Sequence, residues 1–234
     1  KLSLDVEQVR ELMQGRIKFE NIIRKVLIKR GGIAYIKPAP ENFPTIDVFN
    51  RMVESAGAIP CIAWLDGTSE GEQDIEKLLG MMIDCGGGAI NIIPERNWNI
   101  ADGVVKTRKV KALHKVVALA DDWCVPILIG TEMNSFGQHL VDDLNVPELA
   151  TLKNSFQKGA QFIYGHTRLD RVWGLGYQSR WAQENFSRRE EKIAFYTEVG
   201  RLIPPGILDI KKKEEISPSL TPELVLRVLK NGTE

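Results

Sequence analysis

The stretch GAIPCIAWLDGTSE, residues 57–70, contains the pattern that decides the fold: a short apolar run that ends at a polar cluster. Residues 89–93 and 125–130 are apolar runs that end in the same way, and a fourth apolar run occupies residues 32–37. The segments between the runs have the apolar spacing of helices. Strands that alternate with helices predict right-handed βαβ crossovers and a parallel sheet, and hence an α/β fold.

The polar clusters behind the runs are expected to form one site, because parallel strands deliver their carboxyl ends to one edge of a sheet. Four strands are too few to close a barrel, so either the sheet is open or further strands precede Lys1. We expect three regions. They are an α/β portion over residues 1–136, a helical extension packed on it over residues 137–210, and a charged linker with a C-terminal helix over residues 211–234.

The charge balance excludes two classes of partner. Thirty-one basic and 31 acidic residues cancel, so neither a nucleic acid nor a membrane is expected. No apolar run approaches the roughly 20 residues that span a bilayer, and residues 1–15 are charged and amphipathic, unlike a signal peptide. The three cysteines lack metal-ligand spacing and are expected to be buried free thiols. Together these features predict a cytoplasmic protein.

Four segments carry a resemblance to a known family. Residues 56–64 (AGAIPCIAW) look like an Ala-Gly-Gly-x-x-x-x-Ala-His strand, and residues 88–94 (GAINIIP) look like a Gly-Ile-Glu-x-x-x-Pro strand. Residues 119–134 look like a segment ending in Gly-Ser-Asp-x-His, and residues 15–27 are similar to a helix with an Arg-x-His-Ile-Ala motif. In this order they resemble the carboxyl-terminal part of the polymerase and histidinol phosphatase (PHP) superfamily. The resemblance implies part of a (βα)7-type, TIM-like barrel and metal-dependent phosphoesterase chemistry.

The metal ligands of that family are replaced in this chain. By position, Asn21 and Trp64 stand where the family has histidines, Glu132 stands for an aspartate, and Asn134 stands for the last histidine. The opening His-x-His motif of the family would lie before Lys1. An amide is a weak ligand and an indole is none. We therefore expect either one divalent cation (Mg²⁺, Mn²⁺ or Zn²⁺) held by Glu132 and Asn134, or no cofactor at all.

Asp66 and Glu132 are the candidate catalytic residues, because each carboxylate follows an apolar strand and could hold a cation or activate water. The alternative for Asp66 is a turn residue, since Asp-Gly is a common turn pair. The alternative for Glu132 is a structural salt bridge.

The candidate substrate-binding residues lie within or just behind the strands, with one later histidine: Trp64, Asn91, Glu95, Arg96, Trp98, Asn134 and His166. Arg96 has a planar fork that suits a phosphate or carboxylate, and Trp98 has a flat face that suits a sugar ring. Alternatively, an Arg–Glu pair pins this loop and Trp98 plugs it. His166 is a late ligand or acid, or else a buried histidine with satisfied hydrogen bonds. His139 could reach the same site.

We expect an atypical PHP-like metal-dependent hydrolase that acts on a phosphate ester or another small polar substrate. One alternative is a non-catalytic, degenerate domain that binds a ligand or protein partner, with Trp64 filling the space of a metal. Another is a sugar isomerase or lyase on a related barrel. The expected ligand is a small molecule, phosphorylated or sugar-like, and the sequence leaves homo-oligomer formation open. Each of these functional interpretations requires the side chains of Trp64, Arg96 and Glu132 to meet at one edge of a parallel sheet.

Overall fold

The computed structural model describes residues 5–133, 139–206 and 215–231. The described residues form two compact units, which are residues 5–45, and residues 46–133 together with 139–206 and 215–231. The first unit contains helices α1 (Val6–Gln14) and α2 (Arg16–Leu27) and the 3₁₀ turn η1 (Pro40–Asn42). Asp5 and Gln8 form a capping box at the start of α1, in which each side chain accepts a hydrogen bond from the backbone N–H of the other residue.

The apolar run at residues 32–37 is not a strand, so this prediction is wrong. The segment consists of turns and irregular backbone, and Ile33 and Ile36 are 79% and 86% exposed. The N–H groups of Ile33 and Ala34 bond to the carbonyls of Val26 and Leu27 in α2. These donors are therefore satisfied by the end of a helix and not by a neighbouring strand.

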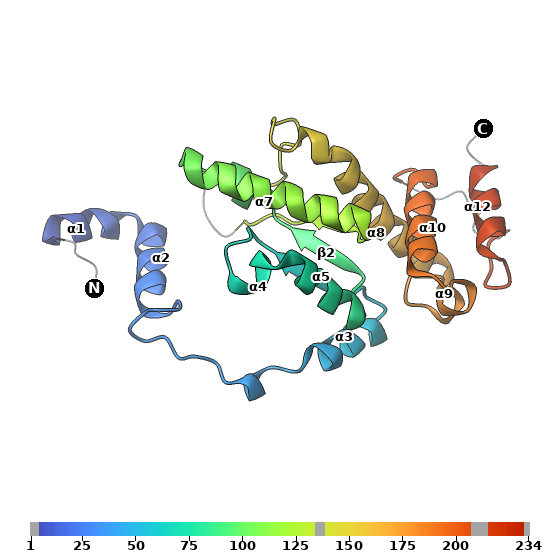
Figure 1. Ribbon diagram of the computed structural model, residues 1–234, viewed down its shortest axis with the longest axis horizontal. Coiled ribbons are helices and arrows are strands. Elements are labelled where there is room, and N and C mark those ends of the chain that lie inside the picture. The colour runs from blue at the N-terminus through green and yellow to red at the C-terminus, as the bar shows by residue number, and fades with distance from the viewer. Residues whose placement is uncertain (1–4, 134–138, 207–214, 232–234) are drawn as a thin grey trace. The chain divides into compact units, whose positions relative to one another are not determined.

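The second unit holds all the strands of the described residues (Figure 1). Its elements in chain order are α3 (Ile46–Ser55), β1 (Cys61–Trp64), α4 (Glu70–Gln73), α5 (Ile75–Asp84), β2 (Ala89–Ile92), α6 (Glu95–Trp98), α7 (Gly103–Asp122), β3 (Ile127–Ile129), η2 (Ala150–Leu152), α8 (Lys153–Trp173), α9 (Arg180–Asn185), α10 (Arg189–Leu202) and α12 (Pro222–Lys230). Strand β1 falls in the quoted stretch at residues 57–70, and the other two strands fall in the runs at residues 89–93 and 125–130.

The three strands pair in parallel in the order β1-β2-β3, with Ala63 beside Asn91 and Asn91 beside Leu128. The parallel pairing agrees with the expected βαβ crossovers. The TIM-like barrel is wrong, because the sheet of the described residues is open and its three strands are accompanied by a mostly helical chain. Strand β3 packs against α8 and does not continue into another strand. The short apolar run at residues 162–164 lies within this helix.

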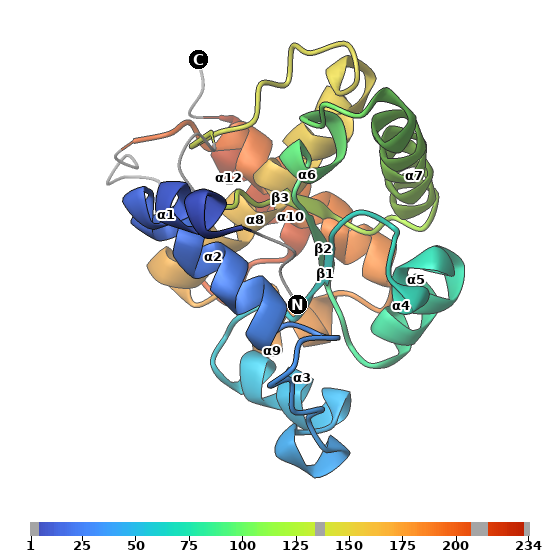
Figure 2. The ribbon, with the colours of Figure 1, turned by 90° about the vertical axis from the view of Figure 1, so that its left-hand side faces the viewer.

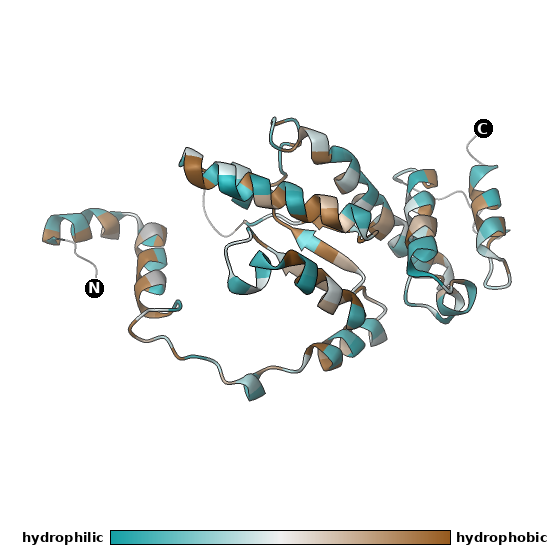
Figure 3. Ribbon diagram, in the orientation of Figure 1, coloured by the Kyte–Doolittle hydropathy of each residue, from teal (hydrophilic) through white to brown (hydrophobic). Residues whose placement is uncertain are grey.

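Helices cover both faces of the sheet. Figures 1 and 2 together show α5 and α7 on one face and α8 on the other, with α10 packed against α8 beyond the amino ends of the strands. Along α7, Leu113, Val116, Val117 and Ala120 are buried, which is the three-and-four spacing of a helix with one apolar face. Hydrophobic and hydrophilic residues accordingly interleave along α7 and α8 in Figure 3.

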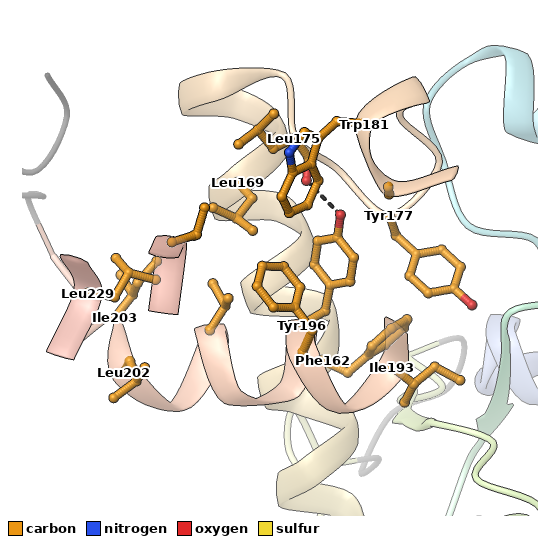
Figure 4. Packing of buried hydrophobic residues seen from close by; sticks show 14 of the residues in the cluster. Phe162, Leu169, Leu175, Tyr177, Trp181, Ile193, Tyr196, Leu202, Ile203 and Leu229 are labelled. Atoms are coloured by element: carbon orange, nitrogen blue, oxygen red, sulfur yellow. Dashed lines mark hydrogen bonds between the residues drawn. The ribbon is translucent and has the colours of Figure 1, made fainter. Parts of the chain in front are cut away.

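The buried hydrophobic residues of the described chain form two core clusters. The first joins the strands to α5, α7 and the beginning of α8, and includes Trp64, Leu79, Ile92, Leu113 and Phe156. The second joins α8 to α9, α10 and α12, and is rich in aromatic residues (Figure 4). In the second cluster the Tyr196 hydroxyl donates to the Leu175 carbonyl at 2.7 Å, so its one polar group is satisfied.

The structure tests the predictions about the cysteines and about membrane-spanning segments. The cysteines are free thiols, as predicted, but Cys61 and Cys124 are exposed and not buried. Among the residues that the structure describes, no helix combines the length and the apolar character needed to cross a membrane.

Helix α8 approaches its neighbours at glycine residues. A Cβ atom on Gly159 would lie 1.8 Å from the Ile127 carbonyl oxygen in β3. On Gly165 it would lie 2.0 Å from the Tyr196 carbonyl oxygen in α10, and on Gly200 it would lie 1.9 Å from the Gln161 carbonyl oxygen in α8. Because these neighbours are backbone atoms, they cannot move aside without shifting a strand or helix. The absence of side chains at these points therefore sets the spacing of α8 from β3 and α10.

We expect Gly165→Ala to lower the free energy of unfolding by about 2 kcal/mol, because the added methyl group overpacks the contact between α8 and α10. Gly103→Ala is the matched control, since Gly103 begins α7 and a Cβ there meets no atom within 4 Å. Urea denaturation followed by circular dichroism measures both variants. Equal stability of the two variants would contradict the close packing of α8.

Candidate functional site

Polar side chains gather at the carboxyl edge of the sheet. Asp66 follows β1, helix α6 follows β2, and Glu132 follows β3. The strands are parallel, so these three segments emerge at the same edge. Helix α7 begins just beyond α6 and adds Lys109 to the group.

Four charged side chains form a continuous network, which we call the four-charge network: Lys109, Asp66, Arg96 and Glu132. Lys109 Nζ lies 2.7 Å from Asp66 Oδ2, and Arg96 Nη2 lies 3.6 Å from the same oxygen. Arg96 Nη1 lies 2.8 Å from Glu132 Oε1. The network holds two cations and two anions, so its formal charges cancel. The Arg–Glu pair that the sequence left open as an alternative is therefore present.

Asp66 is the most buried member of the network, with a side chain 7% exposed. Its Oδ1 accepts hydrogen bonds from the Thr68 N–H at 3.1 Å and from the Thr68 hydroxyl. Burial alone would raise the pKa of Asp66, but the hydrogen bonds from Lys109 and Thr68 and the charge of Lys109 outweigh it and lower the pKa below its usual value. Asp66 is thus a stabilised anion and a weak base.

Asn97 holds the loops of this edge together. Its side chain is fully buried, and its Nδ2 donates to the carbonyls of Leu65 at 2.9 Å and Ile93 at 3.2 Å. These carbonyls belong to the segments that follow β1 and β2. Asn97 therefore fixes the position of α6, which carries Arg96, relative to the loop that carries Asp66.

A second group, which we call the Trp98 cluster, consists of Glu95, Trp98, His139 and Asp142. Trp98 Nε1 donates to Asp142 Oδ1 at 2.9 Å, and His139 Nδ1 lies 2.7 Å from Glu95 Oε1. The His139 ring stacks on the Trp98 ring with a centroid separation of 6.3 Å. One face of Trp98 is therefore covered by His139, which limits its use as a platform for a sugar ring.

The two carboxyl groups of this cluster have opposite pKa shifts. Burial raises the pKa of Asp142 above its usual value; the Trp98 hydrogen bond opposes this, and the negative charge of Glu95 reinforces it. Burial also acts to raise the pKa of Glu95, but hydrogen bonds from Asn99 and His139 lower it overall. The cluster therefore pairs an ionised Glu95 with an Asp142 that retains its proton to higher pH.

Buried polar atoms without a hydrogen-bond partner concentrate at this edge. Five such side-chain atoms occur among the described residues, and four of them belong to residues of this site: Trp64 Nε1, Arg96 Nε, Asn97 Oδ1 and Asp142 Oδ2. Most buried polar groups in proteins are hydrogen-bonded, and an unpaired one costs about 1–3 kcal/mol. Two donors and two acceptors therefore lack a partner at the carboxyl edge.

The other candidates from the sequence occupy different positions. Trp64 is 1% exposed and packs in the first core cluster, so its ring faces no ligand in this conformation. Asn91 Nδ2 donates to the Leu128 carbonyl at 3.4 Å and links β2 to β3. His166 is buried in α8, where its Nδ1 accepts from the Tyr177 N–H at 2.9 Å and burial lowers its pKa. No contact joins His166 to the four-charge network, and Asn134 lies outside the described residues.

The expectation of a metal-binding protein is wrong for the part of the chain that the structure describes, whereas the particular pair of Glu132 and Asn134 is not tested because Asn134 lies outside that part. No group of three or more His, Cys, Asp or Glu side chains in residues 5–133, 139–206 and 215–231 is arranged to hold a metal ion. Glu132 is paired with Arg96, and Asp66 is paired with Lys109. Each carboxylate therefore already has a cation beside it.

Sequence reasoning missed Lys109 and Asp142. For Lys109 a signal was present, because a helix that follows a parallel strand begins at the carboxyl edge of the sheet, and Lys109 lies in the second turn of α7. Asp142 lies in irregular chain, where no periodicity places a side chain. Its contact with Trp98 spans 44 positions of sequence and depends on tertiary structure alone.

Comparison with family models, with curated proteins and with solved structures finds no match for this chain. The resemblance to the PHP superfamily therefore stays a prediction, and the residue roles that it implies gain no support from relatives.

Asp66→Asn should destabilise the protein near neutral pH, and the difference from the wild type should shrink as the pH falls from about 5 through the lowered folded-state pKa. The folded-state pKa of Asp66 is lowered. Its contribution to stability is therefore complete above the unfolded pKa and is lost as the pH falls through the folded pKa. Urea denaturation across this pH range measures the effect. Asp122→Asn at the exposed end of α7 is the control, and an Asp66 difference independent of pH would contradict the argument.

Asp142→Asn should have the opposite pH dependence. The pKa of Asp142 is raised in the folded state. As the pH rises from about 4, the unfolded state therefore loses its proton first, and the folded state holds more protons than the unfolded state. The wild type loses stability over this interval, whereas an amide keeps the acceptor for Trp98 and has no proton to lose. The variant should therefore gain stability relative to the wild type between about pH 4 and pH 7. Thermal unfolding at each pH measures the difference, and a gain that falls with rising pH would refute the assignment.

Proposed function

We propose that the carboxyl edge of the sheet binds a small polyhydroxylated anion, such as a sugar phosphate or sugar acid, without a metal ion. The observation that carries the proposal is the concentration of unpartnered buried polar atoms at this edge. A hydroxyl group both donates and accepts hydrogen bonds. A ligand with several hydroxyls therefore suits an edge where Arg96 Nε is an unpaired donor and Asp142 Oδ2 is an unpaired acceptor.

The anionic group of the ligand is matched by Arg96. Its guanidinium has a planar fork that binds phosphate or carboxylate with two parallel hydrogen bonds. The Arg96 side chain is 34% exposed and that of its partner Glu132 is 26% exposed, so both are accessible from solvent. A ligand anion could take the place of the Glu132 carboxylate on Arg96, while Lys109 and Thr68 keep Asp66 in position.

Binding is better supported than hydrolysis. A general base needs a pKa near the working pH, whereas that of Asp66 is lowered by its contacts with Lys109 and Thr68. Glu132 is engaged by Arg96, and the described residues contain no metal-ion site that could activate water. These contacts favour the ligand-binding alternative over the hydrolase, and no feature of the site favours a sugar isomerase or lyase.

Isothermal titration calorimetry with D-glucose 6-phosphate, D-gluconate, inorganic phosphate and uncharged D-glucose tests the proposal. We expect the two sugar anions to bind more tightly than phosphate or glucose, because only they combine an anion with hydroxyls. Arg96→Gln should weaken binding of the sugar anions about tenfold or more, since it removes a charge-assisted hydrogen bond.

The control for the loss of charge is Arg180→Gln on α9, where an exposed arginine pairs with Glu184 four positions away. This variant should bind as the wild type does. Absence of saturable binding of both sugar anions, or equal binding by Arg96→Gln and the wild type, would refute the proposal. Release of inorganic phosphate from glucose 6-phosphate during the titration would show hydrolysis instead.

A further inference from the structure

A pocket of about 330 Å³ lies away from the carboxyl edge, where the turn that enters β3 meets α8 and α10. Its inner wall is formed by buried apolar residues and a glycine: Val125, Pro126, Ile127, Gly159 and Ile193. Its polar lining comes from the end of α7 and from α8 and α10 (Figure 1). The pocket is thus apolar at its base and charged around its opening.

The wall of the pocket is braced by hydrogen bonds between distant segments. The Arg189 guanidinium at the start of α10 donates to the carbonyls of Trp123 and Cys124 in the turn between α7 and β3. Gly159 allows α8 to lie directly on Ile127 at the base. Because these contacts already exist without a ligand, little conformational entropy would be lost on binding.

Two of the four charged side chains that line the pocket are already paired. Glu198 forms two hydrogen bonds to Arg201, both at 2.7 Å, and Glu190 lies 3.8 Å from Arg188 and 3.7 Å from Arg189. Asp121 accepts a hydrogen bond from the Ser155 hydroxyl but has no cation beside it among the described residues. Lys158 likewise has no anion beside it in the described chain. The pocket therefore presents one unpaired anion and one unpaired cation.

These two unpaired charges line the same pocket. Ser155, which holds Asp121, and Lys158 are three positions apart in α8, and residues at this spacing are neighbours on one helix face, with Cβ atoms roughly 5–6 Å apart. Asp121 and Lys158 form no salt bridge with each other. An α-amino acid carries one ammonium and one carboxylate, which are the counter-charges of Asp121 and Lys158.

We propose that this pocket binds a free α-amino acid with a large apolar side chain. The ammonium group would lie at Asp121, the carboxylate at Lys158, and the side chain against Val125, Ile127 and Ile193. Small-molecule pockets occupy about 300–1,000 Å³, so this pocket is at the low end and suits an amino acid better than a nucleotide. The proposal is independent of the anion site at the carboxyl edge.

Calorimetry with the full chain and L-leucine, L-phenylalanine and L-tryptophan tests the proposal. Two analogues of phenylalanine separate the contacts, because L-phenylalaninamide lacks the carboxylate and N-acetyl-L-phenylalanine lacks the ammonium. We expect each analogue to bind about tenfold more weakly than phenylalanine, the loss typical of one charge-assisted contact.

Two variants should each remove the preference of the pocket for phenylalanine over one of the analogues. In Lys158→Met, phenylalanine should bind about tenfold more weakly and no better than its amide, while in Asp121→Asn it should bind no better than the N-acetyl analogue. Lys115→Met, on the exposed face of α7, is the matched control for the lysine change and should bind as the wild type does. Arg96→Gln should also leave amino-acid binding unchanged.

Absence of saturable binding of all three amino acids at millimolar concentration would overturn the proposal. So would binding that Lys158→Met and Asp121→Asn leave unchanged, or binding that discriminates against neither analogue. Loss of amino-acid binding in Arg96→Gln would place the ligand at the carboxyl edge and would equally refute the assignment to this pocket.

Discussion

The close packing of α8 against β3 and α10 is the constraint on which the second unit depends. At Gly159, Gly165 and Gly200 the backbones approach so closely that any side chain would overlap a neighbouring carbonyl. Helix α8 belongs to both core clusters, through Phe156 in the first and Phe162 in the second. It therefore connects the sheet to the helical layer, and it fixes β3, the strand that leads to Glu132 at one end and begins at the pocket between β3, α8 and α10 at the other.

The carboxyl edge shows how a buried charge is stabilised in this protein. Burying a carboxylate is costly unless a counter-charge and hydrogen bonds accompany it. Arg96 and Lys109 supply the positive charge beside Asp66 and Glu132, and Thr68 provides hydrogen bonds to Asp66. The same edge leaves the Trp98 cluster and the buried side chains of Trp64 and Asn97 with unsatisfied polar atoms. Charge balance is thus complete at this site, whereas hydrogen bonding is not.

The two proposed sites use opposite ends of the sheet and different chemistry. At the carboxyl edge the charges are paired with one another, so a ligand must compete with Glu132 for Arg96. At the pocket between β3, α8 and α10, Asp121 and Lys158 have no counter-ion in the described chain, and the apolar wall is braced by Arg189. The first proposed site would therefore bind its ligand by exchange of hydrogen bonds, and the second by complementary charge and shape.

Local pattern in the sequence determined the three parallel strands, the helices between them and the position of Asp66, Arg96 and Glu132 at one edge, because periodicity and strand direction are properties of short segments. It misled at residues 32–37, where the apolar run forms no strand and the N–H groups of Ile33 and Ala34 bond to carbonyls at the end of α2. Only the tertiary structure decided that the sheet is open, that Lys109 and Arg96 neutralise the carboxylates, and that Asp142 meets Trp98. The charge and hydrogen-bond contacts join residues that are 36 to 44 positions apart in the sequence. Their free energy depends on packing between distant segments, which no local pattern encodes.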